Sequence, residues 1–214
     1  MADNPRRLAI KKLSPDMFRV VDNISIEGLF PDQPTEKAEF SSIGNRFLLD
    51  RVEFFQVQCS RNDFLYSRKN GETYRKQKPL IETKQYLSQK CAMLEAGHKG
   101  AVIVSPCISD GEKALARIAS EMGFPIITLC RTGFERLYKP SGELYDLCAS
   151  GKLLMLAPIA WGVQYGKRTI TREKAVILNR LVQLICKNKG SEIEYQRSQI
   201  KIDDTMVKLA CTPP

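Results

Sequence analysis

GAVIVSPCISDGEKALARIASEMGFPIITLCRTGFERLYKPSGELYDLCASGKLLMLAP, residues 100–158, is the stretch with the clearest apolar pattern. It contains three short apolar runs, Ala101–Ser105, Ile126–Cys130 and Leu153–Ala157, which are too short for helices and typical of buried strands. The segments between them have helical spacing and end at glycines, as helices commonly do. Alternating strands and helices predict an α/β fold with an open parallel sheet.

Ligands of open parallel sheets bind beyond the carboxyl ends of the strands. In this stretch and the residues after it, those ends are Ser105–Gly111, Cys130–Leu137 and Ala157–Arg172. A binding site is therefore expected among these three segments.

Further elements extend the pattern on both sides. Val52–Cys59 is predicted to be the first and central strand, and the polar residues Ser60 and Arg61 follow its carboxyl end. An apolar stripe predicts a helix over Thr83–Ala96 that stops at Gly97. A second clear stripe predicts an amphipathic helix over Glu173–Lys187.

The sequence divides into a domain at 47–189 and two flanking segments. Residues 1–46 are expected to form an N-terminal extension that is partly irregular, with short strands such as Ile24–Ile26 and a loop around Pro31 and Pro34. Residues 190–214 are expected to form a tail with edge strands and a frayed end.

Composition excludes several classes of protein. No run approaches the roughly 18 apolar residues that span a bilayer, and residues 1–15 lack an apolar signal region, so a cytoplasmic protein without membrane contact is expected. Seven scattered cysteines without a C-x-x-C pair indicate reduced thiols rather than disulfides or zinc. With His98 as the single histidine and no nucleophile elbow, we expect no catalytic residues, no metal, no cofactor and no enzyme activity.

The net charge of +9 is unevenly spread. Residues 1–50 contain seven Lys/Arg and eight Asp/Glu, so the cationic excess lies in the remainder of the chain. Such an excess favours an anionic partner, most commonly nucleic acid, although a basic protein without such a partner is the alternative.

Two segments combine cations with aromatic rings, as single-strand binders do. Residues 61–78 contain six Lys/Arg, two acids and three aromatic residues, with a Lys69–Gly71 turn that suits a hairpin. Residues 158–172 contain Lys167, Arg168 and Arg172 near two aromatic rings at the expected binding edge. The alternative is that both segments are solvated loops whose rings cover the core.

The start of the helix predicted after the apolar run Ala101–Ser105 is a candidate anion site. Ser109 or Asp110 can cap the helix, and backbone amides up to Gly111 can bind an anion. Asp110 and Glu112 oppose an anion there, and a helix start needs no function, so both interpretations stay open.

In their order along residues 44–187, several motifs resemble the Rossmann-like domain of the DNA-processing protein A (DprA/Smf) family. The matching features are Gly44-Asn45 before Leu48-Leu49, a strand ending in Ser60-Arg61, the loop and helix SPCISDGEKALA, the strand and turn PIITLCRTGFERLYKP, Gly151-Lys152-Leu153-Leu154, and Arg172 with Asn179-Arg180. The sequence departs from the family pattern at two points. Cys59 stands before Ser60-Arg61 where the family has a glycine, and the basic residue of the family's second loop is absent.

The resemblance implies a Rossmann-like open parallel sheet with helices on both faces that binds single-stranded DNA through strand-end loops, in recombination or transformation. The positions carried over are Ser60, Arg61, Ser105, Gly111 and Arg180; the residue reasoning adds Ser109, Lys167, Arg168 and Arg172. A recombinase and a second copy of the chain are further candidate partners.

Two other functions remain as alternatives. Similar Rossmann-like proteins of the lysine-decarboxylase-like (LOG) group hydrolyse nucleoside monophosphates, and Ser105–Glu112 has the position of their loop and a glutamate, but only one glycine. The third candidate is a protein-interaction module that binds no nucleic acid.

Overall fold

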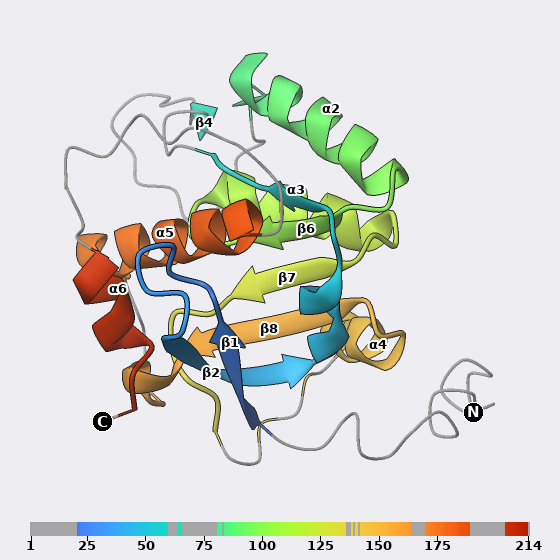
Figure 1. The fold of residues 1–214 in the computed structure, drawn as a ribbon. Helices are drawn as coiled ribbons and strands as arrows, with labels where there is room; N and C mark the ends of the chain where they lie inside the picture. Colours follow the sequence, from blue (N-terminus) through green and yellow to red (C-terminus); the bar gives the residue numbers. More distant parts are fainter. Residues whose placement is uncertain are drawn as a thin grey trace, which may run out of the picture.

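The computed structural model describes residues 21–59, 64–65, 81–82, 84–135, 138, 140, 142–163, 170–188 and 204–213. Figure 1 shows their fold, which is α/β with a six-stranded, mostly parallel open sheet. The strands are β1 (Asp22–Glu27), β2 (Lys37–Gly44), β3 (Phe54–Gln56), β4 (Phe64–Leu65), β5 (Ile81–Glu82), β6 (Val102–Ser105), β7 (Ile126–Leu129) and β8 (Leu153–Pro158). The helices are η2 (Arg46–Asp50), α2 (Lys84–His98), α3 (Asp110–Glu121), α4 (Glu143–Ala149), η4 (Ile159–Trp161), α5 (Arg172–Asn188) and α6 (Asp204–Ala210).

The sheet has the strand order β1-β2-β8-β7-β6-β3. Four strands of the sheet run parallel to one another: β3, β6, β7 and β8. β2 runs antiparallel to β8, and β1 runs antiparallel to β2. The three predicted apolar runs of the central stretch are β6, β7 and β8, and their side chains are buried on both faces, as the uninterrupted apolar sequence indicates.

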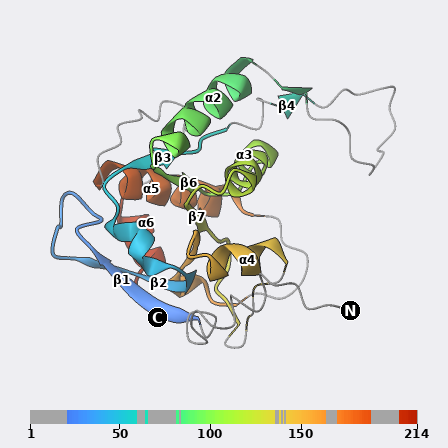
Figure 2. The ribbon, with the colours of Figure 1, turned by 90° about the vertical axis from the view of Figure 1, so that its right-hand side faces the viewer.

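Alternate residues of these strands enter two separate cores. One core contains Ile103, Ile126 and Leu153 and is covered by α2, α3 and α4. Figure 2 shows α3 and α4 on one side of the sheet and α5 and α6 on the other. Helices therefore cover both faces of the sheet, which confirms the prediction.

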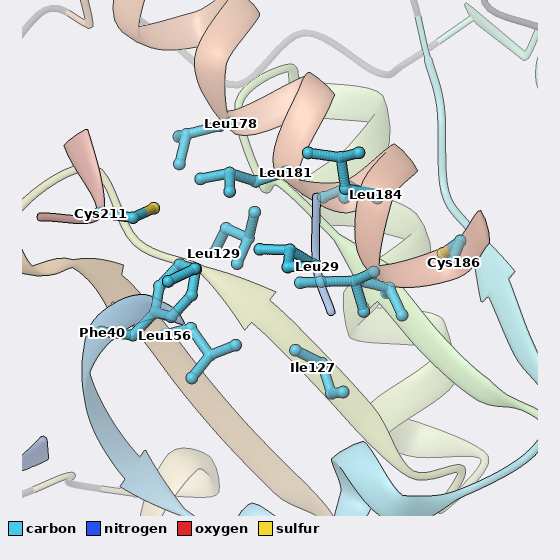
Figure 3. Packing of buried hydrophobic residues seen from close by; sticks show 14 of the residues in the cluster. Leu29, Phe40, Ile127, Leu129, Leu156, Leu178, Leu181, Leu184, Cys186 and Cys211 are labelled. Carbon is cyan, nitrogen blue, oxygen red and sulfur yellow. The ribbon is translucent and has the colours of Figure 1, made fainter. Parts of the chain in front are cut away.

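The other core lies between the sheet and α5. Figure 3 shows Leu178, Leu181 and Leu184 of α5 above Ile127 and Leu129 of β7. These five side chains are at most 2 % exposed, and Leu181 and Leu184 belong to the stripe that predicted the amphipathic helix.

The segment expected as an N-terminal extension supplies β1 and β2 to the central sheet. The predicted strand Ile24–Ile26 lies within β1, and the predicted Pro31–Pro34 loop joins the two strands. Phe40 of β2 is fully buried against the α5 side of the sheet, so this segment completes the core.

The C-terminal end is docked, and the prediction of a frayed end is wrong for Cys211. Its side chain is 1 % exposed, and the Glu39 N–H of β2 donates to its carbonyl oxygen at 2.8 Å. The helix α6 was not predicted; Arg180 of α5 pairs with Asp204 at its start, at 2.8 Å. The predicted edge strands at 193–195 and 200–202 lie outside the described residues.

Two further predictions are corrected. The strand expected to be central is β3, which has three residues and lies at the end of the strand order. Gly97 does not stop its helix, because α2 continues to His98. A Cβ at Gly97 would collide with the ring of Phe124, so this glycine permits close packing of α2 on the connection between α3 and β7.

Within the part of the chain that the structure describes, no helix is both long and apolar enough to cross a membrane. The seven cysteines are all free; Cys59, Cys148, Cys186 and Cys211 are buried, and Cys91 is exposed.

Candidate functional site

A cavity of about 380 Å³ lies at the carboxyl ends of β6, β7 and β8. Its lining comes mostly from the segment that follows β7, which includes Arg131, Phe134, Glu135 and Tyr138. β6 contributes Cys107 through the loop after it, and β8 contributes Met155. Parallel strands bring these chain segments together because all of them end at the same edge of the sheet.

The cavity combines a cation, a carboxylate and two aromatic rings. Arg131 and Glu135 are exposed, whereas Phe134 and Tyr138 are half-buried, with ring centroids 5.5 Å apart. The Gly133 N–H donates to the Gly162 carbonyl oxygen at 2.7 Å, which ties this loop to the one after β8. A guanidinium group beside flat rings can contact a phosphate and an unsaturated ring of the same ligand.

Two thiols line the same cavity, and both are protonated at neutral pH. Burial raises the pKa of Cys107 to about 11 and that of Cys130 to about 12, although the positive charge of Arg131 opposes both shifts. A thiol with so high a pKa is not an activated nucleophile. The two cysteines therefore present neutral sulfur atoms to the cavity.

The loop between β6 and α3 is organised by the carboxylate of Glu112, whose side chain is 3 % exposed. This carboxylate accepts hydrogen bonds from the backbone N–H groups of Ile108 and Ser109 at 2.9 Å, and of Cys59 at 3.4 Å. The Ser109 hydroxyl accepts from the Glu112 N–H in return, which completes a capping box. Glu112 therefore joins the end of β3 to the start of α3.

We expect Glu112→Ala to lower the free energy of unfolding by about 3 kcal/mol or more, because one buried unpaired donor alone costs about 1–3 kcal/mol. Three backbone donors lose their acceptor in this variant. Urea denaturation measures the change, with Glu121→Ala as the control. Glu121 lies on the same helix in an exposed pair with Arg117, so its loss should cost at most about 1 kcal/mol. Equal effects of the two substitutions would contradict the role of Glu112.

The same carboxylate gives stability a pH dependence. Burial raises the pKa of Glu112 above its ordinary value of 4.5, with the backbone hydrogen bonds opposing the shift. The folded state then holds the proton of Glu112 more tightly than the unfolded state. The stabilisation that this proton binding contributes is complete below the ordinary pKa and is lost as pH rises through the raised pKa. Urea denaturation of the wild-type chain at a series of pH values should show this loss of stability, and Glu112→Ala should remove the pH dependence.

The structure brings three of the predicted site residues together at the end of β6. Ser109 and Gly111 lie at the start of α3 and are buried, and Ser105 is fully buried at the end of β6. The Ser105 hydroxyl accepts hydrogen bonds from the N–H and the thiol of Cys107, at 3.2 and 3.4 Å. The Ser109 N–H is occupied by Glu112, so the chain supplies its own anion at the predicted anion site.

The remaining predicted residues lie elsewhere or outside the described part. Arg172 is exposed at the start of α5, and Arg180 donates to both carboxylate oxygens of Asp204 and to Gln183. Ser60, Arg61, Lys167 and Arg168 lie outside the described residues, as does the Lys69–Gly71 turn. On either side of that turn, β4 and β5 pair antiparallel.

Sequence reasoning assigned no site residue to the segment after β7, although it placed Cys130–Leu137 at the binding edge. The missed residues are Arg131, Phe134, Glu135 and Tyr138. A signal was present, because this connection is long for a strand-to-helix loop and contains a cation close to aromatic residues.

No family model, curated protein or solved structure matches this chain.

Proposed function

We propose that the protein binds single-stranded DNA at the carboxyl ends of β6, β7 and β8. The observation that carries the proposal is the cavity of about 380 Å³, lined by Arg131, Phe134 and Tyr138. Its volume falls within the range of about 300–1,000 Å³ that is usual for ligand sites. The net charge of +9 supports an anionic ligand.

Each part of the lining matches a part of a nucleotide. The Arg131 guanidinium suits a phosphate, and the rings of Phe134 and Tyr138 suit the face of a base. The Glu135 carboxylate suits the exocyclic amino group of a base, since a carboxylate accepts hydrogen bonds. Bases are accessible to such contacts in a single strand and are stacked within a duplex.

The position of Glu112 does not support the alternative of nucleotide hydrolysis. That alternative was based on this glutamate, which would have to face the ligand. The Glu112 carboxylate instead accepts three backbone hydrogen bonds and does not line the cavity. The glutamate that suggested hydrolysis thus has a structural role.

We expect Arg131→Ala to weaken binding of oligo-dT by about ten- to a hundredfold, because a charge-assisted hydrogen bond contributes about 1.5–3 kcal/mol. Fluorescence anisotropy at several salt concentrations measures the affinity, and the slope of log affinity against log salt should fall by about one in magnitude. Arg117→Ala is the matched control, since Arg117 is exposed on α3, outside the cavity lining, where it pairs with Glu121.

Equal affinity of the Arg131→Ala and Arg117→Ala variants for oligo-dT would contradict binding of DNA at the cavity. An absence of binding to oligo-dT by the wild-type chain in dilute buffer would overturn the proposed function as a whole.

A further inference from the structure

Glu135 supplies a carboxylate to the cavity at the carboxyl ends of β6, β7 and β8. Its side chain is exposed, and within the part of the chain that the structure describes it forms no ion pair. A carboxylate repels the phosphates of DNA, so it lowers the affinity of a site that binds DNA through charge alone. At the proposed DNA site, this carboxylate favours a ligand that also presents hydrogen-bond donors.

The segment after β7 holds this carboxylate close to the two aromatic rings of the cavity. The Tyr138 N–H donates to the Glu135 carbonyl oxygen at 2.8 Å. Phe134 directly precedes Glu135, and its ring centroid lies 5.5 Å from that of Tyr138. The Gly133 N–H anchors the start of the segment by donating to the Gly162 carbonyl oxygen at 2.7 Å. Rings that suit the face of a base and a carboxylate that suits its edge therefore lie on one short, anchored segment.

The edges of the four bases differ in how well they match a carboxylate, which accepts hydrogen bonds with both oxygens. Guanine presents two neighbouring donors on its Watson–Crick edge, the ring N1–H and the exocyclic amino group. Adenine and cytosine present an amino group beside a ring nitrogen that accepts, and thymine presents a single N–H between two carbonyl oxygens. Guanine is therefore the base that can satisfy both carboxylate oxygens. This edge is accessible in a single strand.

We propose that Glu135 makes the DNA site selective for guanine, by accepting hydrogen bonds from the N1–H and the amino group of one base. This inference rests on the proposed function, because it concerns a base of single-stranded DNA in the same cavity. Arg131 contacts the phosphate and the rings of Phe134 and Tyr138 contact the face of the base, whatever the base is. Glu135 thus determines the choice of base rather than the affinity for DNA as such.

Binding of the wild-type chain to three oligonucleotides of one length tests the selectivity, with fluorescence anisotropy as the measurement. The first is oligo-dT, the second alternates dT with dG, and the third alternates dT with deoxyinosine. We expect the oligonucleotide with dG to bind about five- to a hundredfold more tightly than oligo-dT, the discrimination that a bidentate contact to a base provides. Hypoxanthine, the base of deoxyinosine, keeps the N1–H but lacks the amino group, so the third oligonucleotide should bind more weakly than the second.

Glu135→Gln tests the residue. The variant places an amide NH₂, which donates, where a carboxylate oxygen accepted, so the ratio of the affinities for the dG oligonucleotide and oligo-dT should fall to about one. Its affinity for oligo-dT should not fall, because a negative charge near the phosphates is removed. Glu121→Gln is the matched control, since Glu121 lies on α3, outside the cavity lining, and this variant should keep the wild-type ratio.

The outcomes separate this inference from the proposed function. If oligo-dT binds and the oligonucleotides with dG or deoxyinosine bind no differently from it or from each other, the recognition of guanine is overturned and DNA binding stands. A wild-type ratio in Glu135→Gln, or an equal loss of affinity for all three oligonucleotides, would overturn the role of Glu135. A wild-type chain that bound none of them would overturn the proposed function and this inference with it.

Discussion

We expect Val207→Asp to unfold the protein at temperatures at which the wild-type chain is folded. Val207 is the fully buried residue of α6, and it packs in the core between the sheet and α5. A carboxylate without a partner in this position carries a desolvation penalty of several kcal/mol. The whole stability of a domain is commonly about 5–15 kcal/mol, so a single such substitution removes a large part of it.

The contacts of α6 explain why the effect should spread beyond this short helix. Ion pairs join it to two other parts of the fold, from Asp204 to Arg180 of α5 and from Lys208 to Glu36 before β2. Directly after the helix, Cys211 accepts a hydrogen bond from β2. Undocking α6 would therefore expose apolar side chains of α5 and of the sheet to water.

Leu209→Asp is the matched control, because Leu209 lies on the same helix but is 66 % exposed. Thermal denaturation followed by circular dichroism should give this variant a melting temperature close to that of the wild-type chain. If Val207→Asp melted at the same temperature as Leu209→Asp, α6 would not be docked in solution.

The second large effect is expected at Gly44, the last residue of β2. Its φ is 101°, a conformation that side chains rarely adopt, and a Cβ at this position would collide with the carbonyl oxygen of Leu153 in β8. The same oxygen accepts the hydrogen bond from the Asn45 N–H at 2.8 Å. We expect Gly44→Ala to lower the free energy of unfolding by about 2–5 kcal/mol, since a positive φ costs about 1–2 kcal/mol and overpacking about 1–3 kcal/mol more.

Gly100→Ala separates the two contributions. The φ of Gly100 is 93°, close to that of Gly44, but no atom lies within 4 Å of the position of its Cβ. Chemical denaturation should therefore show a loss of about 1–2 kcal/mol for Gly100→Ala, from backbone strain alone. A loss at Gly44 no larger than the loss at Gly100 would contradict the close approach of β2 and β8.

Close approaches of this kind mark the limit of what sequence reasoning could predict. Gly97 was interpreted as a helix stop, because a glycine after an apolar stripe is typical of one. The actual reason for it is the ring of Phe124, which is distant in the sequence and lies against α2 only in the folded chain. Pattern alone does not distinguish a glycine that ends a helix from one that admits a neighbour.

The candidate site, too, was predictable from the sequence only in part. The edge of the sheet that holds the cavity was predictable, because the carboxyl ends of parallel strands share one edge. Glu112 was considered as an obstacle to an anion or as a catalytic group, and its structural role depends on the Cys59 N–H, which β3 brings to the start of α3. Arg180 was a predicted phosphate contact, and its pairing with Asp204 depends on α6.

The sequence by itself determined the α/β class and the positions of β6, β7, β8, α3 and α5. Strands buried on both faces need uninterrupted apolar runs, and helices packed on a sheet need an apolar residue every three to four positions. Local patterns in the sequence therefore predict where these strands and helices lie. Only the tertiary structure decided the strand order, the antiparallel entry of β1 and β2, the docking of α6 and the lining of the cavity. Each of these depends on contacts between residues far apart in the chain, which leave no periodic pattern in the sequence.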